Sequence, residues 1–450
     1  MHCRDFPKFR SRVYVMNPIY TRQTLNYVCR SKLYSTKLPN PPVEDRLPLS
    51  GIRVCDLTRV LAGPYCTQIL ADQGAEVIKI EHPQRGDDTR AWGPPFAKPL
   101  HSTKRANNPG ESAYFLSVNR NKQSIGLSFA HPIGQQILHK IIASSDVLVE
   151  NYIPGSLSKY GLAYHQLKER YPALIYASIT GYGQTGPYAS RAGYDVMVEA
   201  EMGLMHMTGE PTRTPVKVGV AVTDLTSGLY CANAILLALM SRSKTGKGQA
   251  IDVALSDCQV ATLTNIASSN LISGDKGHRH GTSHPSIVPY QAFDTADGAI
   301  LIGGGNDRLF GILCTALQKP EWIVDARFKT NTFRVQHRNV LVSMITEITS
   351  KQTTSFWLDH FHGSGMPYAA VNDIQQTMTH PHVLARDMVK EMDHSTAGPI
   401  KLVNTPVKFS ENRPGIRSAP PTLGMHTNDI LERLGYGSEI QTWREEGIIS

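Results

Sequence analysis

One carboxylate stands out in the sequence because of the residues around it. Asp224 follows the β-branched run Val218–Val222 and precedes an apolar helical stretch, so it is expected at a strand-to-helix junction. Asp is favoured there for structural reasons, because it caps free N–H groups and suits the positive end of a helix dipole. Gly219 and Gly228 flank it and would let a ligand approach closely. The pattern is therefore consistent with a helix cap and with a nucleophile toward acyl groups.

A second group consists of cationic and amide side chains in the segments that follow predicted strands. Each one alone is typical of a solvated surface. Together they would gather at one edge of a parallel sheet, where Arg, Lys and amide groups can bind a phosphorylated ligand. These residues are Arg59, Arg90, Asn119, Lys122, Asn151 and Lys159.

Other catalytic and metal-binding patterns are missing from the sequence. There is no G-x-S-x-G, H-E-x-x-H, P-loop or EF-hand motif, and no G-x-G-x-x-G follows the first predicted strand. His278, His280 and His284 lie in a polar, Gly-rich segment without helical spacing, which favours a loop over a metal site. The seven cysteines are scattered and never spaced as C-x-x-C, so we expect neither a disulfide framework nor a zinc site.

These side chains must be positioned by alternating strands and helices. Short β-branched runs alternate with helical patterns, and the first strand, helix and strand occupy about 30 residues, the length of a βαβ unit. The pattern predicts a doubly wound, Rossmann-like α/β fold with a parallel sheet. The predicted strands are 51–57, 75–81, 147–149, 173–179 and 250–253, and the helices are 62–74, 134–145, 167–171 and 225–241.

The chain is too long for one typical domain. We expect a large α/β domain over residues 46–255, followed by linkers and a smaller α+β domain over 256–375, where Ala299 opens a second set of strands and helices. Residues 376–450 contain proline-bearing segments and a last helix at Asn428–Leu434, and they are expected to return to the large domain.

The net charge of +8 is concentrated at the amino terminus. Residues 1–42 contain eight Lys or Arg and one Asp, a net charge of +7, so the rest of the chain is nearly neutral. This composition is typical of a mitochondrial targeting segment and predicts a matrix protein, with a basic arm for RNA or lipid as the alternative. A nearly neutral body argues against a nucleic-acid partner. The longest apolar run, Ala234–Met240, is too short to span a membrane.

Ordered sequence blocks from about Leu47 to Leu434 together resemble the family III CoA-transferases. The blocks are Pro48–Thr58, Ala62–Pro64, Gly74–Glu81, Asn121–Ile125, Asp146–Gly155, Tyr176–Gly183, Ala192–Asp195, Asp224–Gly228 and Lys244–Gln249. The resemblance implies that CoA moves between dicarboxylic acids, with succinyl-CoA as donor and glutarate or 3-hydroxy-3-methylglutarate as acceptor. It also implies an interlocked homodimer, acyl-CoA thioesters as substrates, and no permanently bound cofactor.

The resemblance further implies roles for individual residues. Asp224 would be the nucleophile, and Val60, Asn151 and Lys159 would contact CoA, with Arg59 and Arg90 nearby. The family's glycine-rich lid corresponds here to Gly281–Pro285, so its hydrogen-bond donors must differ. Near this segment, Arg279, His280 and Arg308 are candidates for binding the distal carboxylate of the acid.

Two alternatives belong to other functional classes. The related acyl-CoA racemases carry a His where this chain has Tyr194, and a phenol with a pKa near 10 is a poor substitute for an imidazole in α-proton exchange. Tyr194 is therefore expected to contact substrate only. A CoA-binding protein without catalytic activity would retain the loop cations but have no need of Asp224 and Gly228.

Overall fold

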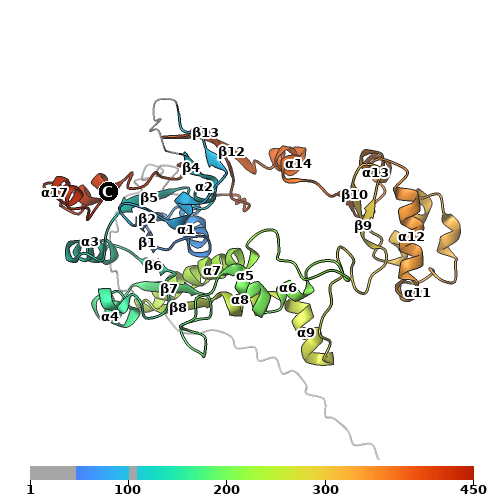
Figure 1. The fold of residues 1–450 in the computed structure, drawn as a ribbon, viewed down its shortest axis with the longest axis horizontal. Coiled ribbons are helices and arrows are strands. Elements are labelled where there is room, and N and C mark those ends of the chain that lie inside the picture. Colours follow the sequence, from blue (N-terminus) through green and yellow to red (C-terminus); the bar gives the residue numbers. More distant parts are fainter. Residues whose placement is uncertain (1–46, 101–108) are drawn as a thin grey trace, which may run out of the picture. The chain divides into compact units, whose positions relative to one another are not determined.

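The computed structural model describes residues 47–100 and 109–450, so the predicted targeting segment lies outside the described residues. A six-stranded parallel sheet in the order β5-β2-β1-β6-β7-β8 forms the centre of the first domain (Figure 1). Its strands are β1 (Arg53–Leu57), β2 (Glu76–Glu81), β5 (Lys122–Gly126), β6 (Val147–Glu150), β7 (Ile175–Thr180) and β8 (Ala250–Ala254). The predicted doubly wound α/β architecture is confirmed at the level of this parallel sheet.

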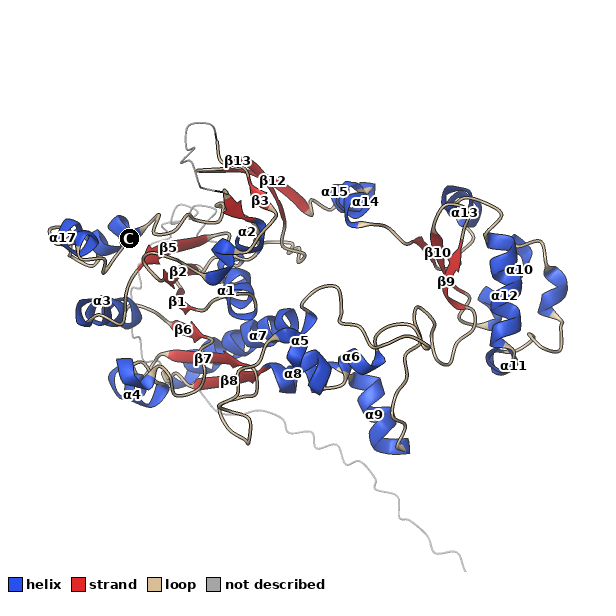
Figure 2. Cartoon of the chain, in the orientation of Figure 1, coloured by secondary structure: helices blue, strands red, loops and turns tan. Residues whose placement is uncertain are grey.

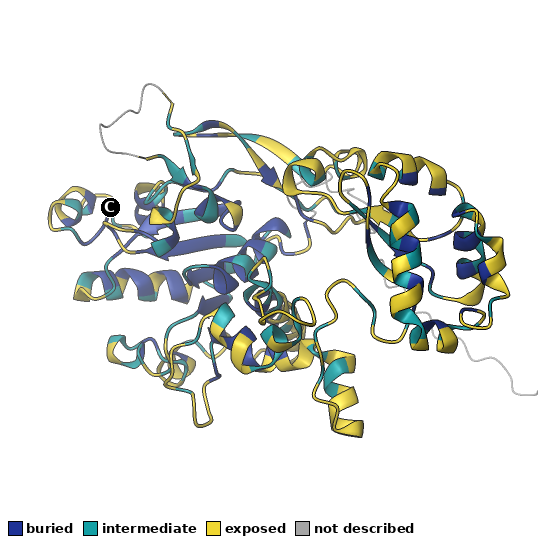
Figure 3. Cartoon of the chain, turned by 45° about the vertical axis from the view of Figure 1, so that its right-hand side comes forward, coloured by how far each residue is buried: buried dark blue, intermediate teal, exposed yellow. Residues whose placement is uncertain are grey.

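Alternation along the strands gives the sheet two apolar faces. Val54 of β1 faces one core and its neighbour Cys55 faces the other, as the two-residue period of a strand requires. Most residues of the central strands are accordingly buried (Figure 3). The helices that contribute to the first core are α1 (Ala62–Asp72), α5 (Asp195–Glu201), α7 (Val222–Thr245) and α8 (Leu255–Thr262). Those of the second are α3 (Pro132–Ala143), α4 (Tyr164–Arg170), α16 (Thr427–Arg433) and α17 (Ile440–Glu445).

Helix α7 is the central helix of the first core. Within the described part of the chain, it is the one helix long and apolar enough to cross a membrane by length and composition. Cys231, Ala232, Ile235 and Ala238 nevertheless pack into the first core, as expected for a core helix. Polar residues interrupt its sequence, so its longest uninterrupted apolar run, Ala234–Met240, is much shorter than the helix. The opposite face of α7 carries exposed apolar side chains.

A separate antiparallel sheet, ordered β11-β10-β9, belongs to the second domain (Figure 2). Its core contains Val288, Phe293, Ile300, Phe310 and Trp357. The elements are β9 (Tyr290–Asp294), β10 (Ala299–Gly303), β11 (Tyr368–Ala370), α10 (Asp307–Ala316), α11 (Asn331–Gln336), α12 (Arg338–Thr349) and α13 (Thr354–Phe361). Helix α8 packs in the first core, so the packing of the large domain continues past residue 255.

The segment after the second domain contacts the first domain again. Gly424 donates its N–H to Ser124 Oγ at 3.0 Å, and Leu127 forms a β-bridge with Ile449 beside the edge strand β5. Shorter elements lie in the connecting segments. They are α2 (Ala113–Ser117), α6 (Leu204–Met207), α9 (Thr264–Ser273), α14 (Ile374–Thr379), α15 (Pro381–Ala385) and the short pairs β3 (Phe96–Ala97) with β4 (Glu111–Ser112) and β12 (Val389–His394) with β13 (Gly398–Val403).

Candidate active site

Asp224 lies in the first turn of α7, but no strand precedes it. The residues before Ala221 form an irregular segment. Asp224 is also not the cap that the sequence suggested. Ala221 occupies the cap position and has no side-chain acceptor, so the carboxylate of Asp224 is not used to cap its own helix.

A second carboxylate caps this helix instead. Asp195 Oδ2 accepts the backbone N–H groups of Thr223 at 2.9 Å and of Asp224 at 3.1 Å. Burial, with repulsion from Asp195 as the second cause, raises the pKa of Asp224 to about 7. A half-buried carboxylate with this pKa is partly protonated near neutral pH, and perturbed groups of this kind are concentrated at functional sites.

The two glycines near Asp224 differ in role. A Cβ atom on Gly228 would lie 2.7 Å from the carbonyl oxygen of Ala62, so this glycine allows α1 and α7 to pack closely. The interpretation that Gly228 admits a ligand is therefore wrong. A Cβ atom on Gly219 would meet no atom within 4 Å, which leaves open space on that side.

The loop after β1 is fixed by contacts to its backbone. Asn151, which follows β6, accepts the Arg59 N–H at 3.0 Å and donates to the Arg59 carbonyl oxygen at 2.7 Å. Val60 adopts a positive φ of 72°, unusual for a β-branched residue, and its N–H points at both oxygens of Asp87 at 3.3 Å. The loop is therefore held in one conformation at the carboxyl end of the sheet.

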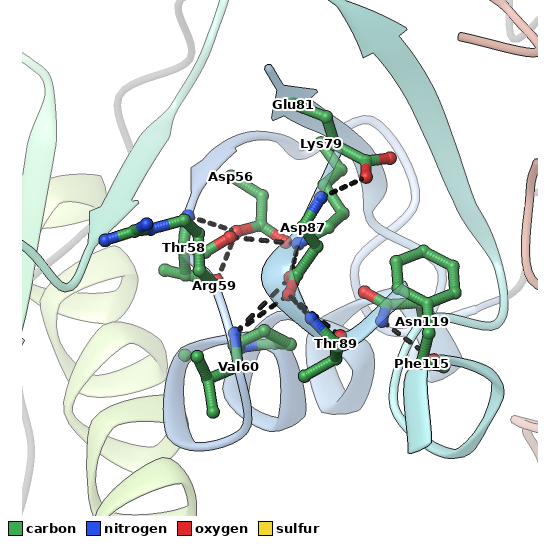
Figure 4. A network of polar contacts seen from close by, with 12 residues as sticks. Asp56, Thr58, Arg59, Val60, Lys79, Glu81, Asp87, Thr89, Phe115 and Asn119 are labelled. Atoms are coloured by element: carbon green, nitrogen blue, oxygen red, sulfur yellow. Dashed lines mark hydrogen bonds and ion pairs between the residues drawn. The ribbon is translucent and has the colours of Figure 1, made fainter. Parts of the chain in front are cut away.

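A network of buried charges supports this loop (Figure 4). Lys79 donates to Asp87 Oδ2 and to the Thr58 carbonyl oxygen, both at 2.9 Å. Asp56 accepts hydrogen bonds from Thr58 and Thr67. Burial opposes ionisation of Asp87, but attraction to Lys79 and hydrogen bonds outweigh it and hold the pKa at about 2. Asp87 thus remains a carboxylate that can orient Val60.

Two adjoining cavities lie along this loop. One of about 400 Å³ contains Asp224 and is lined by Arg59, Val60, Asn151 and Tyr194. The other, of about 370 Å³, is lined by Arg59 and by Lys159. The structure therefore brings together Asp224 and four of the predicted residues, and Arg59 and Lys159 share the second cavity.

Three of the predicted ligand-binding residues are bonded to other side chains in the protein interior. Arg90 donates to Glu81 at 2.7 Å from two nitrogens and stacks on Phe115. Lys122 and Asn119 bond each other at 2.9 Å in the buried network. None of the three lines either cavity, so their contribution within this chain is structural.

The residues near the predicted lid also lie outside these cavities. Arg279 donates to the His206 carbonyl oxygen at 2.9 Å, whereas His280 and Arg308 are exposed. His278 lies 3.7 Å from Asp275, and no group of three metal-ligating side chains occurs among the described residues. In this part of the chain, the histidines therefore form no metal centre.

Sequence analysis missed two residues of the site. Arg191 lines the Asp224 cavity and bonds Glu201 at 2.9 Å, and Asp195 caps α7. Asp195 belongs to the block Ala192–Asp195 and Arg191 adjoins it, but only Tyr194 of this block is a candidate from its residue type. The position of that block next to the nucleophile in space was not visible from spacing along the chain.

Comparison with known proteins adds independent support. The model of "CoA-transferase family III" matches residues 49–427. The human succinyl-CoA:glutarate CoA-transferase is 46% identical over 89% of this chain and 89% of its own length. The succinate–glutarate CoA-transferase of Agrobacterium fabrum is 40% identical over 89% of this chain and 98% of its own. A crystal structure of a CaiB/BaiF family protein from Brucella suis matches 86% of this chain and 99% of its own, with a TM-score of 0.78 and 42% identity. The chain belongs to the family III CoA-transferases.

Proposed function

We propose that this CoA-transferase moves CoA from succinyl-CoA to glutarate or 3-hydroxy-3-methylglutarate, with Asp224 as the nucleophile. The observation that carries the proposal is the position of Asp224, half-buried in the cavity that Arg59, Val60 and Asn151 also line. The printed names of the human and Agrobacterium relatives, which act on succinyl-CoA or succinate and glutarate, support the choice of acids.

The reaction needs only a carboxylate and the two substrates. Asp224 attacks the thioester carbonyl of succinyl-CoA, which forms a mixed anhydride and releases the CoA thiolate. The thiolate attacks the aspartyl carbonyl, which releases succinate and leaves an aspartyl-CoA thioester. The acceptor carboxylate attacks this thioester and displaces the thiolate, which then attacks the acceptor's acyl carbonyl and frees Asp224. No proton is gained or lost in the sum.

The two cavities offer a path for CoA. Arg59 lines both, and Lys159 lines the one without Asp224, so the phosphates of CoA would lie between these cations while the thioester reaches Asp224. In the free chain Arg59 pairs with Asp88 at 2.9 Å, and a phosphate would compete with that carboxylate. The amide of Asn151 is already bound to the Arg59 backbone, so Asn151 would act by shaping the loop.

The distal carboxylate of the acid requires a cation near Asp224. Arg191 lines the Asp224 cavity, together with Tyr194. Within this chain it is better placed than the predicted Arg279 and Arg308, neither of which lines that cavity. A guanidinium can bind a carboxylate through two donors, which would favour dicarboxylic acids.

A homodimer is consistent with the exposed apolar side chains of α7 and α9. Leu237 is 60% exposed, and Leu271 and Ile272 are 85% and 86% exposed. Such a surface is typical of an interface. A second copy is the proposed occupant, because the family resemblance implies an interlocked dimer.

Import into the mitochondrial matrix is proposed from the basic composition of residues 1–42. The amino terminus of the organellar protein, read by mass spectrometry, should lie near residue 38. An intact Met1 in the organelle would contradict cleavage.

The decisive assay combines the purified protein with succinyl-CoA and glutarate and measures glutaryl-CoA. Asp224→Asn should fold and bind CoA but lose at least ~10³-fold of turnover, because the covalent route is removed. Hydroxylamine added after succinyl-CoA should modify Asp224. CoA binding without transfer in the wild type would favour the non-catalytic alternative, and exchange of an α-proton would favour a racemase.

A further inference from the structure

The carboxylates of Asp195 and Asp224 are both found at the first turn of α7. Asp195 accepts hydrogen bonds from backbone N–H groups of this turn, to which Asp224 belongs. Asp195 begins α5, and its Oδ2 accepts the N–H of Asp224 itself at 3.1 Å as well as that of Thr223 at 2.9 Å. Thr223 is buried, and Val198 of α5 packs in the same core as α7. The position of Asp195 relative to Asp224 is therefore fixed by α5 packing and by two hydrogen bonds.

The other charged groups near the site do not cancel the repulsion between the carboxylates of Asp195 and Asp224. Burial raises the pKa of Asp195, while the two backbone N–H groups and then Lys217, in the segment before α7, favour its charged form. Glu199 of α5 repels it. Tyr114 of α2 faces both carboxylates, and its own pKa is raised by burial first and then by their charges. The other charged groups of the cavity are Arg59, Asp88 and Arg191, and the first two pair with each other. Of these groups, only Asp195 contributes to the raised pKa of Asp224, after burial.

Repulsion between the two carboxylates depends on the chemical state of Asp224. The free side chain carries a negative charge, whereas the mixed anhydride and the aspartyl-CoA thioester are neutral at that position. A fixed negative charge nearby therefore destabilises the free carboxylate but not the adducts. Attack by Asp224 relieves this destabilisation.

We propose that Asp195 is a positioning residue that holds the first turn of α7 and, by its charge, favours the covalent adducts over the free Asp224 carboxylate. The inference rests on the proposed function, because it requires that Asp224 forms the adduct. It gives Asp195 a role in the reaction without contact to the reacting atoms.

Two variants separate the charge of Asp195 from its hydrogen bonds. Asp195→Asn keeps an oxygen that can accept the two N–H groups and removes the charge, whereas Asp195→Ala removes both. Asp257→Asn is the matched control, because it removes an exposed carboxylate from the first turn of α8 outside both cavities. If Asp195→Asn does not fold, Asp195→Ser offers a neutral oxygen acceptor for the same measurements.

The first readout is the amount of aspartyl-CoA enzyme at a fixed ratio of succinyl-CoA to succinate, measured by intact-protein mass spectrometry. We expect Asp195→Asn to lower the ratio of adduct to free enzyme about 10-fold, the change that corresponds to one pKa unit. The second readout is the acid limb of kcat/KM, which should move down by about one pH unit, because Asp224 must be ionised to attack. Asp257→Asn should change neither.

The possible outcomes distinguish failure of this inference from failure of the proposed function on which it rests. If wild-type enzyme forms no adduct on Asp224, the proposed function is wrong and the inference fails with it. If wild type forms the adduct and Asp195→Asn matches it in both readouts, the function stands and the role of the Asp195 charge is overturned. In that case, a defect in Asp195→Ala alone would identify Asp195 as a structural cap only.

Discussion

Asn151 and Arg59 are joined by two hydrogen bonds that run in opposite directions between the Asn side chain and the Arg backbone. The amide oxygen accepts the Arg59 N–H at 3.0 Å, and the amide nitrogen donates to the Arg59 carbonyl oxygen at 2.7 Å. Because Asn151 follows β6 and Arg59 follows β1, the pair connects the ends of two adjacent strands. The conformation of the proposed CoA-binding loop therefore depends on a side chain from the next strand.

Removal of this connection should weaken CoA binding. Asn151→Ala eliminates both hydrogen bonds, each of which contributes about 1 kcal/mol, so we expect the Kd for CoA in calorimetry to rise about 10-fold or more. Asn428→Ala, on the exposed surface of α16, is the control and should leave the Kd unchanged. An unchanged Kd in Asn151→Ala would show that the loop is held adequately by Asp87 alone.

Asp224 should reduce the stability of the folded protein at neutral and higher pH. Its pKa of about 7 in the folded state exceeds the unfolded value of about 3.9, so the native state binds more protons between these values. The free energy of unfolding therefore falls as the pH rises from about 4 to 7, and this loss is complete above 7. Asp224→Asn should be more stable than wild type by up to about 4 kcal/mol at pH 8 and equally stable at pH 4, as measured by denaturant unfolding. Equal stability at both pH values would contradict the raised pKa.

The buried pair of Lys79 and Asp87 should be sensitive to the loss of one partner. Lys79→Met leaves the Asp87 carboxylate buried without its cation and should cost about 3–5 kcal/mol of unfolding free energy. Lys390→Met breaks the exposed pair with Asp387 and should cost less than about 1 kcal/mol. The Asp87 contribution to stability should be present above pH 4 and be lost as the pH falls toward 2. Similar losses in the two variants would argue against the network as a support of the loop.

Two alanine substitutions test the packing of α7 on α1. Gly228→Ala places a Cβ atom 2.7 Å from the Ala62 carbonyl oxygen, so it should destabilise the protein by about 1–3 kcal/mol and lower activity by moving the first turn of α7. Gly219→Ala has open space and should be tolerated. Melting temperature and turnover measured for both variants check this expectation. The reverse order of effects would restore the interpretation that Gly228 serves ligand access.

The proposed dimer can be tested at its apolar surface. Leu271→Asp combined with Ile272→Asp places two charges on α9, and sedimentation should then show monomers or aggregates instead of dimers, because buried unpaired charges are costly. Val324→Asp, at an 81% exposed position in the second domain, is the control for an added surface charge. Wild-type protein that sediments as a monomer would refute the dimer.

Local patterns predicted much of the fold but less of the site. The strand 51–57 and the helix 62–74 were found because alternation and the positions of Pro64 and Gly74 are visible in the sequence. By contrast, the β-branched run before Asp224 forms no strand, although the edge strand β8 has a neighbour in the sheet on one side only. Propensity alone does not decide whether a segment pairs with a sheet edge.

The same limit explains the cationic residues. The sequence gives no reason to prefer Arg59 over Arg90 as a ligand-binding residue. In the structure, Arg90 is paired with Glu81 in the interior, whereas Arg59 lines both cavities. Asp195 was missed because its partners are backbone N–H groups of a segment 28 and 29 residues away. Contacts of this kind arise only when helices pack in three dimensions.

The contribution of the last segment to the large domain affects the order of folding. Ile430, Leu431, Ile440 and Trp443 belong to the same core as strands β1 and β2, although the second domain separates them in the chain. A ribosome therefore produces all six strands of the sheet before α16 and α17, which cover one of its faces together with α3 and α4. A nonsense mutation after the second domain would leave part of this apolar face uncovered, so the truncated protein should be removed by proteolysis, even though every candidate active-site residue has been translated.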